Sequence, residues 1–241
     1  MSAKPKLPIV ATIVTFVAVV IMFALGYWQL QRAEVKEVRL AQIKQRKQSS
    51  PFAPSDLLAR GAEQDIRDFP ITTQGYFQRE HYFLRDNSVQ RGKVGYEVIV
   101  PFVSESGLLL VNLGWVAGRE YREQLPVVSI AEGMLQIEGI VSLPSLNPMV
   151  AETAVADNAW PKRIQQVDLE VMAKLLNKPL LPMVVLLDPS SPIGFERNWQ
   201  AVVMAPEKHL GYAVQWFALG IAALLVFGFS IRARFIRKQD E

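Results

Sequence analysis

The sequence predicts an α+β membrane protein, in which an N-terminal and a C-terminal transmembrane helix bracket one mostly antiparallel β external domain with short helices. Three observations predict this class. Two long apolar runs without charges lie near the ends of the chain. The roughly 180 residues between them, enough for one domain, alternate apolar and polar residues in short runs separated by turn residues. Half of the 241 residues are apolar and only 20% are charged, so part of the chain is shielded from water beyond an ordinary core.

The apolar runs at residues 7–30 and 210–231 are each long enough to span a bilayer. A hydrocarbon core about 30 Å thick needs about 20 apolar residues in a helix. The first run passes through Ala24-Leu25-Gly26, a possible cleavage site, so a signal peptide is the alternative. Signal peptides have shorter apolar regions than this run, and the following Tyr27-Trp28-Gln29-Leu30 is typical of an interfacial anchor, so we favour a retained helix.

Charged and aromatic residues orient the two spans. Four basic residues follow the second span, as is typical of a cytoplasmic tail: Arg232, Arg234, Arg237 and Lys238. Aromatic residues lie where the first span ends and where the second span begins, and so form one interfacial belt on the outer side: Tyr27, Trp28, Tyr212 and Trp216. We therefore expect cytoplasmic tails at residues 1–6 and 232–241 and a periplasmic domain at residues 31–209, with both spans in the cell inner membrane.

Four segments of the external domain have a helical pattern: residues 32–47, 55–60, 119–124 and 168–176. The first of them continues the first span, because it lacks glycine and proline. Ser55 and Asp168 are the expected N-caps of the second and fourth.

Seven segments have a strand pattern: residues 66–77, 81–86, 95–103, 108–116, 134–143, 183–187 and 199–204. Asp86-Asn87 is one of the turn signals between them. The strands do not alternate with helices, so a doubly wound nucleotide-binding fold is not expected.

The composition excludes several kinds of chemistry. The chain has no cysteine, which excludes disulfides, zinc ribbons, iron–sulfur clusters and thiol-based copper relay. It has only two histidines, His81 and His209, so one chain cannot hold a histidine-rich metal site. The net charge of +3 is too low for a nucleic-acid binder. Phosphate-binding loops, nucleophile elbows and zinc-protease motifs are also missing, so we expect no enzyme and no resident metal.

The best candidate for binding chemistry is His209, one residue before the second apolar run. Trp28 and Arg32 are four residues apart and share a helix face at the end of the first span. If the two spans form a hairpin, these residues join Tyr212 and Trp216 in a small amphipathic site at the membrane rim. An imidazole in such a place suits the axial ligation of haem iron. The alternative is an interfacial residue like its aromatic neighbours, whereas His81 is expected to be a strand histidine at or near the surface.

Several blocks of the chain resemble one known family. The first block is Leu25-Gly26-Tyr27-Trp28-Gln29-Leu30-Gln31-Arg32, at the end of the first span. Further blocks follow in the same order at residues 75–77, 84–87, 92–101, 111–116 and 208–217. Over nearly the whole chain, this ordered set resembles bacterial members of the surfeit locus protein 1 (Shy1) family. Leu113 stands where the family has an arginine, and Val35-Lys36 replaces a Trp-Lys pair, so no role of that arginine is carried over.

The resemblance implies a membrane-anchored assembly factor for haem–copper cytochrome c oxidase, with no turnover of its own. Its expected partners are subunit I, which receives a-type haem, other oxidase assembly factors and membrane lipid, and no nucleic acid. The family histidine proposed to bind haem a transiently corresponds to His209 here.

Two other functions remain as alternatives. The first is an envelope enzyme that uses loop residues such as Arg85, Asp86 and Tyr96. The second is a ligand-binding scaffold or sensor. A sensor is expected to carry a cytoplasmic signalling module, for which tails of six and ten residues leave no room.

Overall fold

The computed structural model describes residues 8–61, 64–121, 124–151, 154, 159–199 and 204–237. The chain forms two compact units. The helix pair consists of α1 (Ile9–Lys47) as far as Gln42 together with α4 (Pro206–Arg237). The sheet unit covers Ile43–Gln200.

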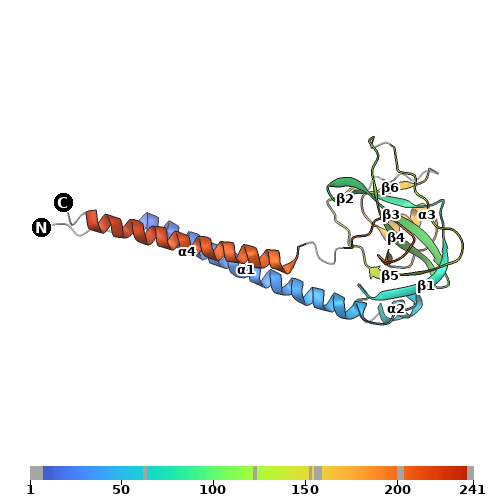
Figure 1. Cartoon of the computed structure of the whole chain (residues 1–241), viewed down its shortest axis with the longest axis horizontal. Helices are drawn as coiled ribbons and strands as arrows, with labels where there is room; N and C mark the ends of the chain where they lie inside the picture. The colour runs from blue at the N-terminus through green and yellow to red at the C-terminus, as the bar shows by residue number, and fades with distance from the viewer. Residues whose placement is uncertain are drawn as a thin grey trace. The chain divides into compact units, whose positions relative to one another are not determined.

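In the helix pair, α1 and α4 run side by side in opposite directions (Figure 1). Each contains a stretch long and apolar enough to cross a membrane. At a rise of about 1.5 Å per residue, the 39 residues of α1 extend well past a bilayer core. The helix ends at Lys47, shortly before Ser49-Ser50-Pro51, so the predicted continuation of the first span through residues 32–47 is confirmed.

The least exposed residues of both helices recur at alternating spacings of three and four. On α1 they include Met22, Gly26, Gln29 and Ala33, and on α4 they include His209, Ala213, Trp216 and Gly220. This spacing is that of helices packed with a shallow left-handed crossing. Gly26 is required by the contact, because an added Cβ would lie 2.7 Å from the Phe217 ring. Phe217 in turn packs edge-on against Phe23, with ring centroids 5.4 Å apart.

The described residues of the sheet unit form seven strands and two short helices. The strands are β1 (Pro70–Phe77), β2 (Phe83–Gln90), β3 (Lys93–Ser104), β4 (Gly107–Ala117), β5 (Leu135–Ser142), β6 (Lys162–Ile164) and β7 (Val184–Leu187). The helices are α2 (Pro54–Gly61) and α3 (Leu169–Leu176). The strand order is β1-β5-β7-β4-β3-β2-β6 and most neighbours are antiparallel, which confirms the predicted α+β class.

Strand β1 also pairs with the end of β3, through Gly75–Phe77 and Phe102–Ser104. This pairing closes β1, β5, β7, β4 and β3 into a small barrel, with β2 and β6 as an extension. Two parallel pairs, β2–β6 and β4–β7, interrupt the antiparallel pattern.

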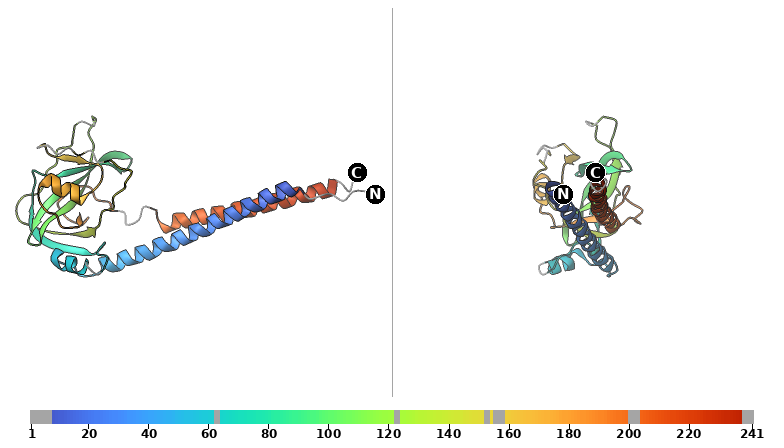
Figure 2. Two further views of the ribbon diagram at one scale, coloured as in Figure 1. Left: turned by 180° about the vertical axis from the view of Figure 1, so that it is seen from behind. Right: turned by 90° about the vertical axis from the view of Figure 1, so that its left-hand side faces the viewer.

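Two apolar cores lie on the two faces of this sheet. The inner core contains alternate residues of β3 and β4, such as Val98, Val100 and Val111. The outer core contains the residues between them, such as Ile99 and Leu110, packed with Met172 of α3. Figure 2 shows α3 lying against the outside of the strands. The central strands are therefore buried on both faces near α3, which explains their long apolar runs.

The strand predictions are confirmed for six segments, with three differences at their bounds or turns. The segments 66–77 and 81–86 begin later, at Pro70 and Phe83. The predicted turn at Asp86-Asn87 is wrong, because these residues form a β-bulge that lets β2 continue to Gln90. Asn87 adopts a φ of 57°, a conformation that asparagine tolerates in bulges as well as in turns.

One predicted helix was wrong, one predicted strand is not tested, and one short strand was missed. Residues 119–121 and 124 form no helix, and residues 122–123 lie outside the described part of the chain. The strand predicted at 199–204 stays a prediction, because residues 200–203 also lie outside the described part of the chain; only its two end residues are described, and neither is in a strand. The very short β6 was not predicted, because a three-residue strand has no detectable period.

The two predicted N-caps have different outcomes. Asp168 is the N-cap of α3, and its side chain accepts hydrogen bonds from Glu170 N at 2.9 Å and Val171 N at 3.1 Å. Ser55 is not the N-cap of α2, since the helix begins at Pro54 and the carbonyl of Ala53 accepts the first helical hydrogen bond. Proline is favoured at the first helical position, where its missing N–H costs nothing.

Candidate functional site

His209 lies in the first turns of α4 and faces α1, with only 8% of its surface exposed. Its Nδ1 lies 2.7 Å from Oε1 of Gln29 on α1. Because an amide oxygen can only accept a hydrogen bond, this pairing requires the proton of the neutral ring to be on Nδ1. The other ring nitrogen, Nε2, is buried and has no hydrogen-bond partner among the described residues. In the neutral ring Nε2 therefore presents an unshared electron pair, the form that binds metals.

Small residues surround this pair on the contact faces. Ala33 and Ala213 are 2% and 1% exposed, and Gly26 lies one turn from Gln29 against Phe217. Small side chains let membrane helices approach closely, so that a polar side chain of one helix reaches the other. Local sequence thus sets the helix spacing at which Gln29 and His209 meet.

The other predicted site residues lie around the same ends of the two helices. The Arg32 guanidinium stacks over the Trp28 ring, 5.3 Å from its centroid. Trp28 and Tyr212 are 45% and 46% exposed, whereas Trp216 is half-buried on the side of α4 that carries His209. These ends of the two helices therefore carry one buried imidazole, two exposed aromatic rings and a cation.

Gln29 was missed at the sequence level, although it lies inside the first family-like block. Its signal was its position, because it is a polar residue on the α1 contact face between Gly26 and Ala33. Finding it required the register of two helices that are 180 residues apart in the sequence.

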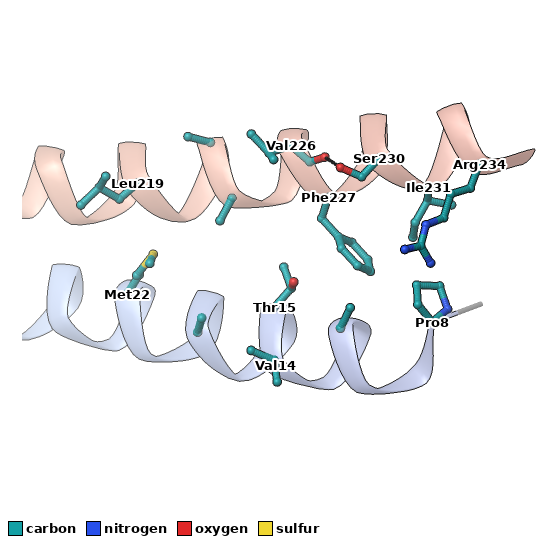
Figure 3. A pocket seen from close by; sticks show the side chains of 14 residues that line it. Pro8, Val14, Thr15, Met22, Leu219, Val226, Phe227, Ser230, Ile231 and Arg234 are labelled. Atoms are coloured by element: carbon teal, nitrogen blue, oxygen red, sulfur yellow. Dashed lines mark hydrogen bonds between the residues drawn. The ribbon is translucent and has the colours of Figure 1, made fainter. Parts of the chain in front are cut away.

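A separate groove of about 630 Å³ lies between the ends of the helices that are distant from His209 (Figure 3). Phe227 points from α4 toward α1 inside it, and Arg234 lies beside Pro8 at its end. The lining is otherwise apolar apart from two hydroxyl groups, of which that of Ser230 already donates to Val226 O. This lining is suited to hydrocarbon chains and offers no set of ligands for a metal ion.

The sheet unit has its own polar cluster, centred on Glu97 of β3. The Glu97 carboxylate accepts hydrogen bonds from the Arg85 guanidinium, Asn112 Nδ2 at 2.6 Å and Ser88 Oγ at 3.3 Å. Bulges interrupt the pairing of β3 with both neighbouring strands beside Glu97, and the Gly114 N–H donates to Asn112 Oδ1 at 3.1 Å. The cluster is internally satisfied and so fits a structural role, in which it holds two irregular strand pairs together.

The enzyme alternative gains no support from this geometry. Tyr96 belongs to the inner core, while Arg85 lines a cleft on the outer face beside Glu97, so these two residues do not converge. Asp86 is only 4% exposed. Within the described residues, no group of three or more histidine, aspartate or glutamate side chains can hold a metal ion.

The shifted pKa values of the sheet unit have structural causes. The hydrogen bond from Arg67 lowers the pKa of Asp65 to about 2. Burial raises the pKa of Tyr82, and the Ser190 hydroxyl lowers that of Asp188. Each of these carboxyls accepts a bond from a residue two positions later, so these shifts reflect local turns and not an acid–base pair.

Comparisons with known proteins agree with the earlier resemblance. A model of the SURF1 family matches residues 16–221. The chain is 29% identical to surfeit locus protein 1 of Gallus gallus, over 82% of this chain and 67% of the relative. It is 25% identical to a SURF1-like protein of Rickettsia felis over 89% of this chain and 94% of the relative, and 26% identical to surfeit locus protein 1 of Homo sapiens over 83% and 70%. The match extends from the first apolar helix through the sheet unit into α4, and the chain belongs to the SURF1 family.

Proposed function

We propose that this protein is a membrane-anchored assembly factor for haem–copper cytochrome c oxidase, and that it assists insertion of a-type haem into subunit I. Family membership and two candidate membrane helices support the assembly role. In this proposal the tails at residues 1–6 and 232–241 are cytoplasmic, and residues 31–209 face the periplasm from the cell inner membrane.

The observation that carries the haem part of the proposal is the buried Nε2 of His209, which has no partner among the described residues. Leaving a buried polar atom unpaired costs about 1–3 kcal/mol, and a ligand that binds this atom removes that cost. Haem a would supply an iron ion, for which an imidazole nitrogen is a suitable ligand. The donor present at the site therefore fits the group.

The surrounding residues have roles of their own in this proposal. Trp28, Tyr212 and Trp216 offer apolar ring surface to a porphyrin, and Arg32 offers a cation to its propionate groups. Subunit I, other oxidase assembly factors and membrane lipid are the proposed partners. In this proposal the chain holds haem a only transiently, before the haem enters subunit I.

A deletion strain tests the assembly role. We expect membranes of the deletion strain to contain cytochrome c oxidase with low a-type haem content, and the wild-type copy to restore it. Haem content is measured from difference spectra and normalised to subunit I on an immunoblot. A deletion strain that keeps normal oxidase with full a-type haem would overturn the proposal.

A further inference from the structure

We infer that Gln29 is a positioning residue for His209: its amide oxygen holds the proton on Nδ1 and thereby leaves Nε2 free to bind a ligand. The inference deepens the proposed function, and it rests on that function only where haem a is concerned. The tautomer of His209 is a property of the protein alone.

The hydrogen bond between Gln29 and His209 has a defined direction. Gln29 Oε1 and His209 Nδ1 are 2.7 Å apart, a short distance for an N–H···O bond. Outside this bond, free imidazole exchanges its proton between the two nitrogens, and a ring with its proton on Nε2 cannot bind a metal through that atom. Gln29 selects the one neutral form in which Nε2 is a ligand.

Both partners of this hydrogen bond are shielded from water. His209 is 8% exposed and Gln29 is half-buried, so water competes poorly for their hydrogen bond. A hydrogen bond is electrostatically stronger in such surroundings than in water. The packing of Gly26 against Phe217 fixes the helix register one turn away, which keeps the amide opposite the imidazole.

The group that accepts the hydrogen bond from His209 is an amide and not a carboxylate. Histidine ligands of metals usually donate their second N–H to a carboxylate, a carbonyl or water, and this partner fixes the ring orientation. A carboxylate would add a negative charge beside a charge-free apolar run, where burying a charge is costly. The glutamine oxygen orients the ring and adds no charge.

The histidine count makes a direct test possible. The chain contains only His81 and His209, so ¹⁵N-histidine labelling of the full chain in lipid nanodiscs gives two sets of ring signals. A His81→Phe variant identifies the His209 set. The spectra are recorded without haem at about pH 8, above the ordinary histidine pKa of about 6.5. We expect His209 to show a protonated Nδ1 and an unprotonated Nε2.

Two substitutions and one control isolate the role of Gln29. Gln29→Leu removes the acceptor and is expected to give a mixture of tautomers, whereas Gln29→Glu keeps an acceptor and is expected to keep the wild-type form. Gln31→Leu is the control, because Gln31 lies two residues away on the exposed side of α1. The His81 signals report in each variant whether the sheet unit is folded.

Binding of haem a, extracted from purified oxidase and titrated into the same samples, provides the second readout. We expect Gln29→Leu to bind haem a about 10–100-fold more weakly, the usual cost of losing the partner of a metal-binding histidine. Gln29→Glu is expected to restore most of the affinity, and Gln31→Leu to match the wild type. The inference is wrong if wild-type His209 carries its proton on Nε2, or if Gln29→Leu changes neither the ring signals nor the affinity. The expected tautomer in a protein that does not bind haem a would support the positioning role and contradict the haem part of the proposed function.

Discussion

The helix pair and the sheet unit differ in whether their buried polar side chains have hydrogen-bond partners. In the sheet unit, Glu97 accepts hydrogen bonds from three side chains, and every member of that network has a partner. In the helix pair, His209 has a partner for one ring nitrogen, and its other nitrogen has none among the described residues. A complete network is explained by the stability of the fold. A buried electron pair without a donor lowers stability, and a ligand is the simplest reason to keep it.

The sheet unit also contains one buried polar atom that resembles His209 Nε2 in this respect. Arg197 Nε is also buried without a hydrogen-bond partner among the described residues. The other nitrogens of this guanidinium donate to backbone carbonyls, among them Ile193 O at 2.6 Å and Ser191 O at 2.7 Å. Arg197 therefore uses most of its donors to hold a loop, whereas the acceptor nitrogen of His209 has no donor among the described residues.

The largest expected effect is a loss of stability in the sheet unit that leaves ligand binding unchanged. Glu97→Ala leaves Arg85 and Asn112 without their shared acceptor, at a cost of about 2–3 kcal/mol because the site is partly buried. The melting temperature of the full chain in detergent, followed by tryptophan fluorescence, should fall by about 5–10 °C. Haem a affinity should stay unchanged. Glu105→Ala, at an exposed turn, is the control and should shift the melting temperature little.

The next largest effect is expected for a substitution at the contact between α1 and α4. Gly26→Val forces side-chain atoms into the Phe217 ring, and overpacking of this kind costs about 1–3 kcal/mol. Because the contact lies one turn from Gln29, we expect haem a affinity to fall about tenfold. Gly228→Val is the matched control, since nothing lies within 4 Å of an added Cβ at that glycine. Equal affinities of the two variants would contradict the proposed dependence of the site on helix packing.

A smaller effect is expected at the cap of α3. Asp168→Ala removes the acceptor of two backbone N–H groups, a loss of about 1 kcal/mol. The melting temperature should fall by about 2–4 °C, and Asp168→Ser should restore most of it. A change in haem a binding would be unexpected and would show that the two units are coupled.

The smallest effect depends on pH. Contacts with Arg67 and Arg46 lower the pKa of Asp65 from 3.8 to about 2. The carboxylate therefore stabilises the folded state above pH 3.8 and loses that contribution as the pH falls toward 2. Partial exposure limits the contribution to about 0.5 kcal/mol. The melting temperature of Asp65→Asn should be slightly lower than that of the wild type at neutral pH, and the difference should shrink in acid. A difference that grew on acidification would contradict the ion pair.

Local signals predicted much of the fold and little of the site. The apolar runs, six strands and the Asp168 cap each depend on neighbours within one turn or one strand, so they were visible in the sequence. The bulge at Asp86-Asn87 was not visible in the sequence, because the same two residues also suit a turn. Only the pairing of β2 with β3 determines that they form a bulge. The contact between Gln29 and His209 was also out of reach, because only the packing of two distant helices creates it.

The most direct test of the central claim uses the two histidines in living cells. A deletion strain is complemented with His209→Leu or with His81→Phe, and immunoblots establish that each variant reaches the membrane in wild-type amounts. We expect the a-type haem content of cytochrome c oxidase to stay low with His209→Leu and to be normal with His81→Phe, since His81 lies in the sheet unit and contacts Trp160. Full haem content with His209→Leu would contradict the claim that the buried imidazole of the helix pair is the working residue.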